Sequence, residues 1–145
     1  MGELMMASYQ KFVDASNGLV YLATAVKQKP SVRLVAFAVD ANDESVWYVF
    51  SMDPHAPKTE ELAQNEHVAV VTSVDMKSGM RINSNQVTMV PSQKTWDDVQ
   101  PFFADNQGFL NAHHPEQEKL YELHFDSLVL ETYNPADRQE ITFHN

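Results

Sequence analysis

Three polar side chains in the first half of the chain, Arg33, Ser51 and Lys58, have the chemistry to bind one phosphate group. An arginine offers a planar fork of donors, a hydroxyl adds a hydrogen bond, and a lysine near a helix start brings a second positive charge. Each residue stands at the edge of a predicted element, either a strand or a short helix. The stretch 31–65 is therefore interpreted as an anion-binding arrangement.

The elements that would position these side chains are short and follow one another closely. Apolar runs rich in β-branched and aromatic residues predict strands, and polar clusters predict the turns between them. The predicted order is strand Leu19–Val26, turn Lys27–Pro30, strand Val32–Val39, turn Asp40–Glu44, strand Val46–Phe50 and helix Lys58–Asn65. Arg33 and Ser51 would then lie at the ends of neighbouring strands.

The rest of the chain predicts flanking helices and three more strands, the last of them bulged near Asp126-Ser127. These are helix Glu3–Ala15, strands His67–Val74, Met80–Val90 and Leu120–Tyr133, a capped helix start at Thr95–Asp98 and a polar tail from Asn134. Six strands without βαβ alternation predict a mainly β fold, a small antiparallel barrel with flanking helices. One domain is expected over residues 1–145, with the barrel at about 19–133.

Composition narrows the classes of partner. The 145 residues carry a formal net charge of −10 with only 10 lysines and arginines, which disfavours binding to nucleic acid or to anionic membranes. No cysteine is present, and no apolar run approaches the ~20 residues of a membrane span. These features predict a soluble cytoplasmic protein without disulfides.

Four segments between Leu19 and Pro91 carry a resemblance to a known family. They read LATAVKQKPSVRLVAF, VWYVFS, KTEELAQNEHVAVV and MRINSNQVTMVP, and Lys58, Leu62 and Asn65 keep a K-x-x-x-L-x-x-N spacing. In this order they resemble the pyridoxamine 5′-phosphate oxidase-like family of FMN-binding split barrels. The resemblance implies a six-stranded split barrel that forms a homodimer, with FMN in the groove between the two subunits.

The resemblance also implies roles for six residues. Arg33 would hold the FMN phosphate with Ser51 and Lys58, because the family uses an arginine, a Thr or Ser and a Ser-Arg-Lys run there. Leu34 and Val35 would lie along the isoalloxazine with their backbone groups facing its edge. The cofactor-binding set implied by the resemblance is Arg33, Leu34, Val35, Phe50, Ser51 and Lys58.

Several positions depart from the family pattern. Ala38 stands where the oxidase has a lysine, and Ala56-Pro57 replaces the Ser-Arg before the lysine. Gly79 aligns with the glutamine that contacts the flavin, and Ser84 aligns with a glycine. The basic segment that binds the oxidase's substrate is absent, since Arg138 stands alone in the tail. True pyridoxamine-phosphate oxidase activity is therefore not expected.

Each of these residues also has a purely structural interpretation. Arg33 could be an exposed arginine of a hairpin, and Ser51 an ordinary hydroxyl at a strand end, whereas a lysine at a helix start is unfavourable without an anion. His113-His114 with His124 lack the spacing of zinc sites, so no metal is predicted. The segment Trp96–Phe103 has the spacing of a helix packed on the barrel or in a dimer contact.

The function that follows is FMN binding with oxidoreductase activity on an unidentified substrate. No catalytic residues can be named, as expected if the cofactor carries the chemistry. The alternatives are a non-catalytic module that binds flavin or haem, a relative that binds the deazaflavin F420, and a structural dimer that has lost its cofactor. The departures at Pro57, Gly79 and Ser84 favour this last alternative.

Overall fold

The computed structural model describes residues 2–51, 65–106, 110 and 119–143. Helices and strands do not alternate regularly along the chain, as the periodicity of the apolar residues predicted. In chain order they are α1 (Gly2–Ala15), β1 (Leu19–Val26), β2 (Lys29–Asp40), β3 (Asp43–Ser51), β4 (His67–Thr72), β5 (Arg81–Pro91), α3 (Trp96–Val99), η1 (Gln100–Phe103), β6 (Lys119–Phe125), β7 (Ser127–Glu131), η3 (Pro135–Asp137) and β8 (Gln139–Thr142). The predicted helix Lys58–Asn65 falls almost entirely outside the described residues.

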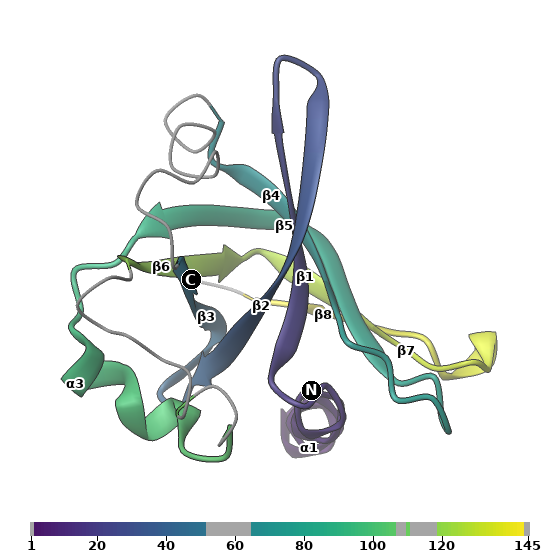
Figure 1. Cartoon of the computed structure of the whole chain (residues 1–145). Helices are drawn as coiled ribbons and strands as arrows, with labels where there is room; N and C mark the ends of the chain where they lie inside the picture. Colours follow the sequence, from purple (N-terminus) through teal and green to yellow (C-terminus); the bar gives the residue numbers. More distant parts are fainter. Residues whose placement is uncertain (1, 52–64, 107–109, 111–118, 144–145) are drawn as a thin grey trace.

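The strands form one antiparallel sheet that closes into a barrel (Figure 1). Their order is β4-β1-β2-β3-β6-β5-β7-β8, and an additional pairing of β4 with β5 joins the two sides of a six-stranded ring. β6 and β7 are the two halves of the single predicted last strand, separated at Asp126. The mainly β, six-stranded antiparallel barrel predicted from the sequence is confirmed.

The polar tail that begins at Asn134 contains a short strand, β8, that was not predicted. β8 pairs with β7, and Ile141 lies opposite Leu128 with both side chains 1% exposed. One apolar residue among polar neighbours is too weak a pattern to predict a strand. The burial of Ile141 comes from the neighbouring strand, which local sequence does not reveal.

Alternation along the strands divides the core into two clusters. The inner face of the barrel holds Phe37, Trp47 and Phe125, whose rings lie 4.3 Å and 4.5 Å apart in two successive contacts. The outer face of β3 carries a second cluster, including Tyr48 and Phe50, that packs under α3 and η1. The term inner face is used below for the side of the sheet lined by Trp47, and outer face for the opposite side.

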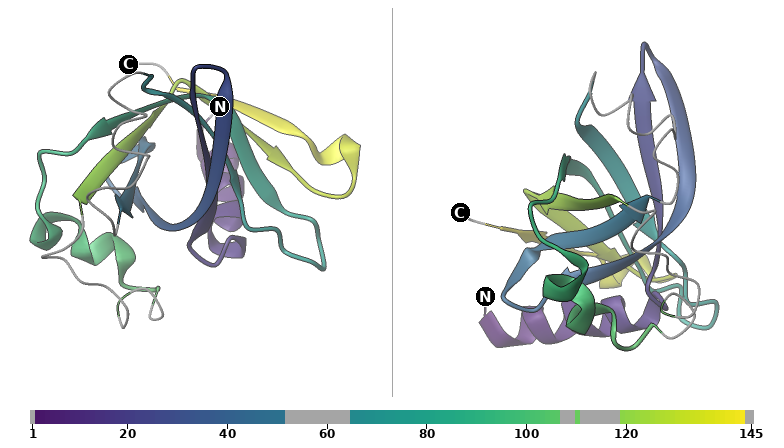
Figure 2. Two further views of the ribbon diagram at one scale, coloured as in Figure 1. Left: turned by 45° about the horizontal axis from the view of Figure 1, so that its top comes forward. Right: turned by 60° about the vertical axis from the view of Figure 1, so that its left-hand side comes forward.

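α1 lies across one end of the barrel (Figure 2) and is fixed to it through Tyr9. The Tyr9 hydroxyl donates to the backbone oxygen of Glu44 at 2.7 Å and accepts from Trp47 Nε1 at 2.7 Å. Burial raises the pKa of Tyr9 above the usual range of a phenol, and the nearby Glu44 and Asp43 carboxylates raise it further. A neutral phenol thus satisfies a buried indole N–H that would otherwise lack an acceptor.

The short helix α3 begins as predicted. Thr95 is its N-cap, and Thr95 and Asp98 form a capping box in which each side chain accepts from the other residue's backbone N–H. The cap directs the chain so that Trp96, Val99 and Phe103 pack onto the outer face of β3. Among the described residues, no helix is both long and apolar enough to cross a membrane.

The β1–β2 hairpin extends beyond the barrel as a two-stranded arm (Figure 1). Lys27 and Gln28 form its turn with φ of 51° and 67°, the conformation that matches the twist of a tight hairpin. β4 pairs with β1 only at Val20–Ala23, and β3 pairs with β2 only from Phe37 onward. The barrel is therefore split where β2 leaves β3.

Candidate functional site

The split leaves one edge of β2 without a described neighbour. β2 pairs with β1 along Lys29–Ala36, whereas its pairing with β3 begins at Phe37. Phe37 N–H donates to Gly18 O at 2.9 Å, so alternation in the antiparallel pair turns the backbone groups of Leu34 and Ala36 away from β1. These groups face the split, where a planar ligand could accept from or donate to them.

Arg33 lies on the inner face beside this edge. It stands opposite the fully buried Leu22, on the same side of β2 as Val35 and Phe37. Its Nη1 donates to Thr24 Oγ1 at 3.2 Å, and Thr24 is only 2% exposed. Arg33 is half-buried, and its guanidinium is oriented by a hydrogen bond to the barrel wall.

Thr24 was missed in the sequence, although a signal was present. Val20, Leu22 and Thr24 alternate toward the inner face, and a threonine that follows two apolar inward residues places a hydroxyl inside the barrel. The same alternation pairs Thr24 with Ser31, diagonally adjacent to Arg33. Thr24 is a positioning residue for the guanidinium.

Leu34 and Val35 lie on opposite faces of β2. Leu34 is 49% exposed on the outer face, directly opposite Tyr21 of β1, which is 43% exposed. Val35 is half-buried and packs against the inner core. The backbone of Leu34 faces the split, whereas alternation turns the backbone groups of Val35 toward β1, and the two side chains lie on opposite sides of the strand.

The side chain of Phe50 belongs to the second core cluster. It is 7% exposed and packs against Trp96 at 5.6 Å and Phe103 at 5.8 Å between ring centroids. Ser51 closes β3 opposite Lys119 of β6. Lys58 lies outside the described residues, so its predicted role stays a prediction.

The end of β3 and the open edge of β2 both begin where these strands separate. Phe37 pairs with Val49, and beyond this pair β3 ends two residues on, at Ser51, while Arg33 stands four residues before Phe37 on β2. The strands separate at this point. A ligand in the split would contact β2 on one side and the end of β3 on the other.

Gly79 and Ser84, two departures from the family pattern, have structural roles. Gly79 has φ +78°, and a Cβ there would lie 2.5 Å from the ring of Tyr133. Ser84 Oγ donates to Ser127 O at 2.6 Å and accepts from Gln86 N–H at 3.0 Å. These hydrogen bonds provide partners for backbone groups at the irregular stretch of β5. Both residues are explained by the barrel itself.

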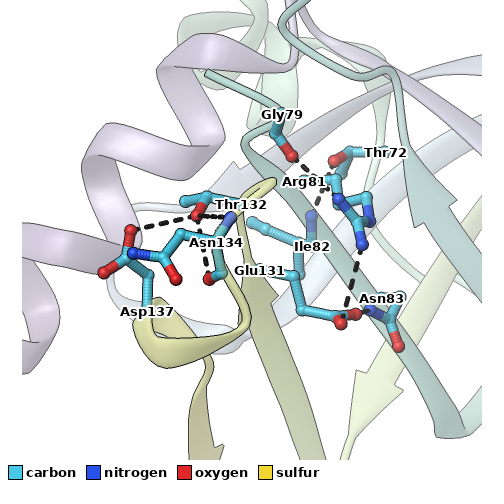
Figure 3. Close-up of polar contacts among 9 residues, drawn as sticks. All are labelled: Thr72, Gly79, Arg81, Ile82, Asn83, Glu131, Thr132, Asn134 and Asp137. Carbon is cyan, nitrogen blue, oxygen red and sulfur yellow. Dashed lines mark hydrogen bonds and ion pairs between the residues drawn. The ribbon is translucent and has the colours of Figure 1, made fainter.

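Arg81, a second arginine of the barrel, is engaged in a polar network on β5 and β7 (Figure 3). Its Nη1 donates to Gly79 O at 3.0 Å, and its Nη2 lies 3.6 Å from Glu131 Oε2. Asn83 Nδ2 donates to the other carboxylate oxygen of Glu131. This ion pair uses the charge of Arg81 within the barrel wall.

Tyr48 is a buried phenol close to the end of β2. Its hydroxyl donates to Asp40 Oδ2 at 2.6 Å, and the Asp40 Oδ1 atom accepts from Asn42 N–H at 2.7 Å. Burial raises the pKa of Tyr48 well above its usual range, and the hydrogen bond to the carboxylate raises it further. Tyr48 therefore stays neutral across the physiological range and fixes Asp40 in place.

Comparison with known proteins supports the fold. No protein-family model matches the sequence, and no curated protein matches it. Among solved structures, a pyridoxamine 5′-phosphate oxidase-related, FMN binding protein from Nostoc punctiforme superimposes with a TM-score of 0.60 at 10% identity, covering 100% of both chains.

Two further structures share the fold. A FAD-binding protein from Mesorhizobium loti gives a TM-score of 0.64 at 12% identity over 86% of this chain and 94% of its own. A heme binding protein from Mycobacterium smegmatis gives 0.67 at 11% identity over 94% of this chain and 57% of its own. The chain therefore has the split-barrel fold of the pyridoxamine 5′-phosphate oxidase-like proteins, as a divergent example of it.

Proposed function

We propose that this protein binds FMN in the split of its barrel and acts as a flavin-dependent oxidoreductase. The observation that carries the proposal is the position of Arg33, half-buried on the inner face, hydrogen-bonded to Thr24 and adjacent to the open edge of β2. A chain with a net charge of −10 has few cations to place. One held in a partly buried setting suits a phosphate.

The residues of the chain would divide the task between them. Arg33 would hold the phosphate with its fork of donors, and Ser51 and Lys58 would complete that site. The backbone groups of Leu34 and Ala36 would orient the ring edge, as they face the split. A bound flavin would supply hydride or electron transfer between a donor such as a reduced nicotinamide and an acceptor.

The test is the visible spectrum of the full-length protein, as purified and after addition of FMN, FAD or haemin. We expect uptake of FMN with flavin absorbance, quenching of flavin fluorescence, and bleaching on addition of NADH or NADPH. A Soret band after haemin addition without FMN uptake would favour the haem alternative. A colourless protein that takes up neither would overturn the proposal.

We also propose that two copies of the chain associate through the outer face of β1, β2 and β4. Three large apolar side chains are exposed there or at its margin: Tyr21 at 43%, Leu34 at 49% and Val32 at 67%. Cross-strand pairing continues this surface through Val71 and Ala23, and none of these residues is charged. For a chain of charge −10, an uncharged apolar face is where a second copy meets least repulsion.

Sedimentation equilibrium tests the dimer. We expect the wild-type chain to sediment as a dimer at micromolar concentration and Leu34→Asp to sediment as a monomer. Met76→Asp adds the same charge at another exposed apolar side chain, 79% exposed, and should leave the dimer intact. A wild-type monomer, with or without FMN, would refute this interface.

A further inference from the structure

A concave site lies at the end of the barrel that α1 covers. It is a cleft of about 650 Å³ between α1, the end of β2, the start of β3 and the η1 segment. Figure 1 shows α1 and the α3–η1 segment at the same end of the barrel. Arg33 and Leu34 are not among the residues that line it, so it differs from the split.

The charges on the cleft wall have one sign. Among the described residues, four carboxylates from different parts of the chain line it and no lysine, arginine or histidine does; the four are Asp14, Asp40, Glu44 and Asp105. Carboxylates that line one cleft create a negative electrostatic potential there, and the low dielectric constant of the protein walls strengthens its attraction for cations. The net charge of −10 acts in the same direction.

Asp40 makes the case specific. Its side chain is only 8% exposed, and its partners among the described residues are two neutral donors, the Tyr48 hydroxyl and Asn42 N–H. No described cation pairs with it, and a buried carboxylate is stabilised further by a positive partner. A ligand cation in the cleft would supply that partner.

The apolar part of the wall indicates the rest of the ligand. Phe37 and Ala38 are buried at the base, Val13 is half-buried, and the Phe102 ring stacks on Tyr48 at 5.8 Å and 8°. An aromatic ring beside carboxylates suits an ammonium group joined to an apolar body. A bare metal ion suits the cleft less well, because no group of three or more His, Cys, Asp or Glu in the described part of the chain could hold one.

We infer that this cleft binds a small organic cation, a primary amine attached to an aryl or alkyl body. The ammonium group lies near Asp40, and the apolar body lies against Phe102 and Val13. The cleft's volume is within the range of about 300–1,000 Å³ typical of small-molecule sites. The inference does not require a flavin, since Arg33, Leu34, Val35 and Phe50, the described side chains among those predicted to bind one, do not line this cleft.

Calorimetric titration of the full chain with benzylamine tests this, with benzyl alcohol as the neutral probe of the same shape. Benzylamine should bind about tenfold more tightly or better, since its ammonium makes a charge-assisted hydrogen bond. Asp40→Asn should weaken benzylamine about tenfold and leave benzyl alcohol unchanged.

Two further variants keep the result interpretable if Asp40→Asn is unstable. Asp105→Asn alters an exposed carboxylate that makes no hydrogen bond or ion pair with a described residue, and it should weaken benzylamine severalfold. Asp126→Asn removes the same charge at the exposed β6–β7 junction, outside the cleft, and should have no effect. Equal binding of amine and alcohol, no measurable binding of benzylamine, or equal weakening by Asp105→Asn and Asp126→Asn would overturn the inference.

Discussion

Replacement of Arg33 by alanine is the most direct test of where a flavin phosphate would bind. A charge-assisted hydrogen bond contributes about 1.5–3 kcal/mol, so loss of the guanidinium should weaken FMN binding about 10- to 150-fold. Riboflavin, which has no phosphate, should be affected much less. The difference between the two ligands isolates the phosphate contact from any general damage to the barrel.

The contact with Thr24 predicts a graded series. Arg33→Lys keeps the charge but loses the planar fork, so it should fall between wild type and Arg33→Ala. Thr24→Val keeps the shape of a buried side chain and removes only the acceptor 3.2 Å from Nη1. FMN binding should then weaken by less than about tenfold, because the guanidinium remains but is held less firmly.

The assay is a titration monitored by quenching of flavin fluorescence, with Lys27→Ala as the matched control. Lys27 is an exposed cation at the turn of the β1–β2 arm, so its removal changes the net charge as Arg33→Ala does. FMN binding by Arg33→Ala that equals wild type would show that the phosphate is placed wrongly. Equal losses for FMN and riboflavin would refute a phosphate-specific role.

Three further predictions follow from other contacts. Tyr9→Phe leaves the buried Trp47 N–H without its acceptor, so it should lower the free energy of unfolding, measured by urea denaturation, by about 1–3 kcal/mol. The control Tyr133→Phe loses only an exposed hydroxyl contact and should lower it by less than about 1 kcal/mol. The free energy of unfolding should fall as the pH rises above about 10. The unfolded chain then releases the protons of Tyr9 and Tyr48, whereas the folded state retains them because both pKa values are raised. A thermal unfolding temperature that is flat from pH 9 to 11 would contradict this. FMN-loaded protein should not convert pyridoxamine or pyridoxine phosphate to pyridoxal phosphate at ~1 per second or faster, a rate ordinary for enzymes, because Ala38 offers no cation for a second phosphate.

Elements set by local sequence were predictable. The bounds of β1 match the predicted Leu19–Val26, the Thr95–Asp98 capping box forms, and the last strand is interrupted at Asp126. In each case a pattern of a few neighbouring residues determines the backbone, through β-branched alternation, a cap or a break. No distant residue was needed to specify them.

Features that depend on partners distant in sequence were not predictable. Alternation along β3 does not show that α3 and η1 cover the side with Phe50. The same limit applies to Leu34, whose outer face shows no covering element among the described residues. Strand β8 was missed because Ile141 gains its burial from Leu128, not from its own neighbours.

The choice among the ligands bound by similar structures depends on a few residues at the edge of the barrel. Structures that share this fold at 10–12% identity bind FMN, FAD or heme, so the common core does not determine the ligand. Haem requires an axial side chain, most often histidine. The two described histidines, His67 and His124, are exposed and flank Thr88 on the outer face, away from the inner face that carries Arg33. The described part of the split thus carries the arginine that we propose as the phosphate ligand, and neither described histidine lies beside it.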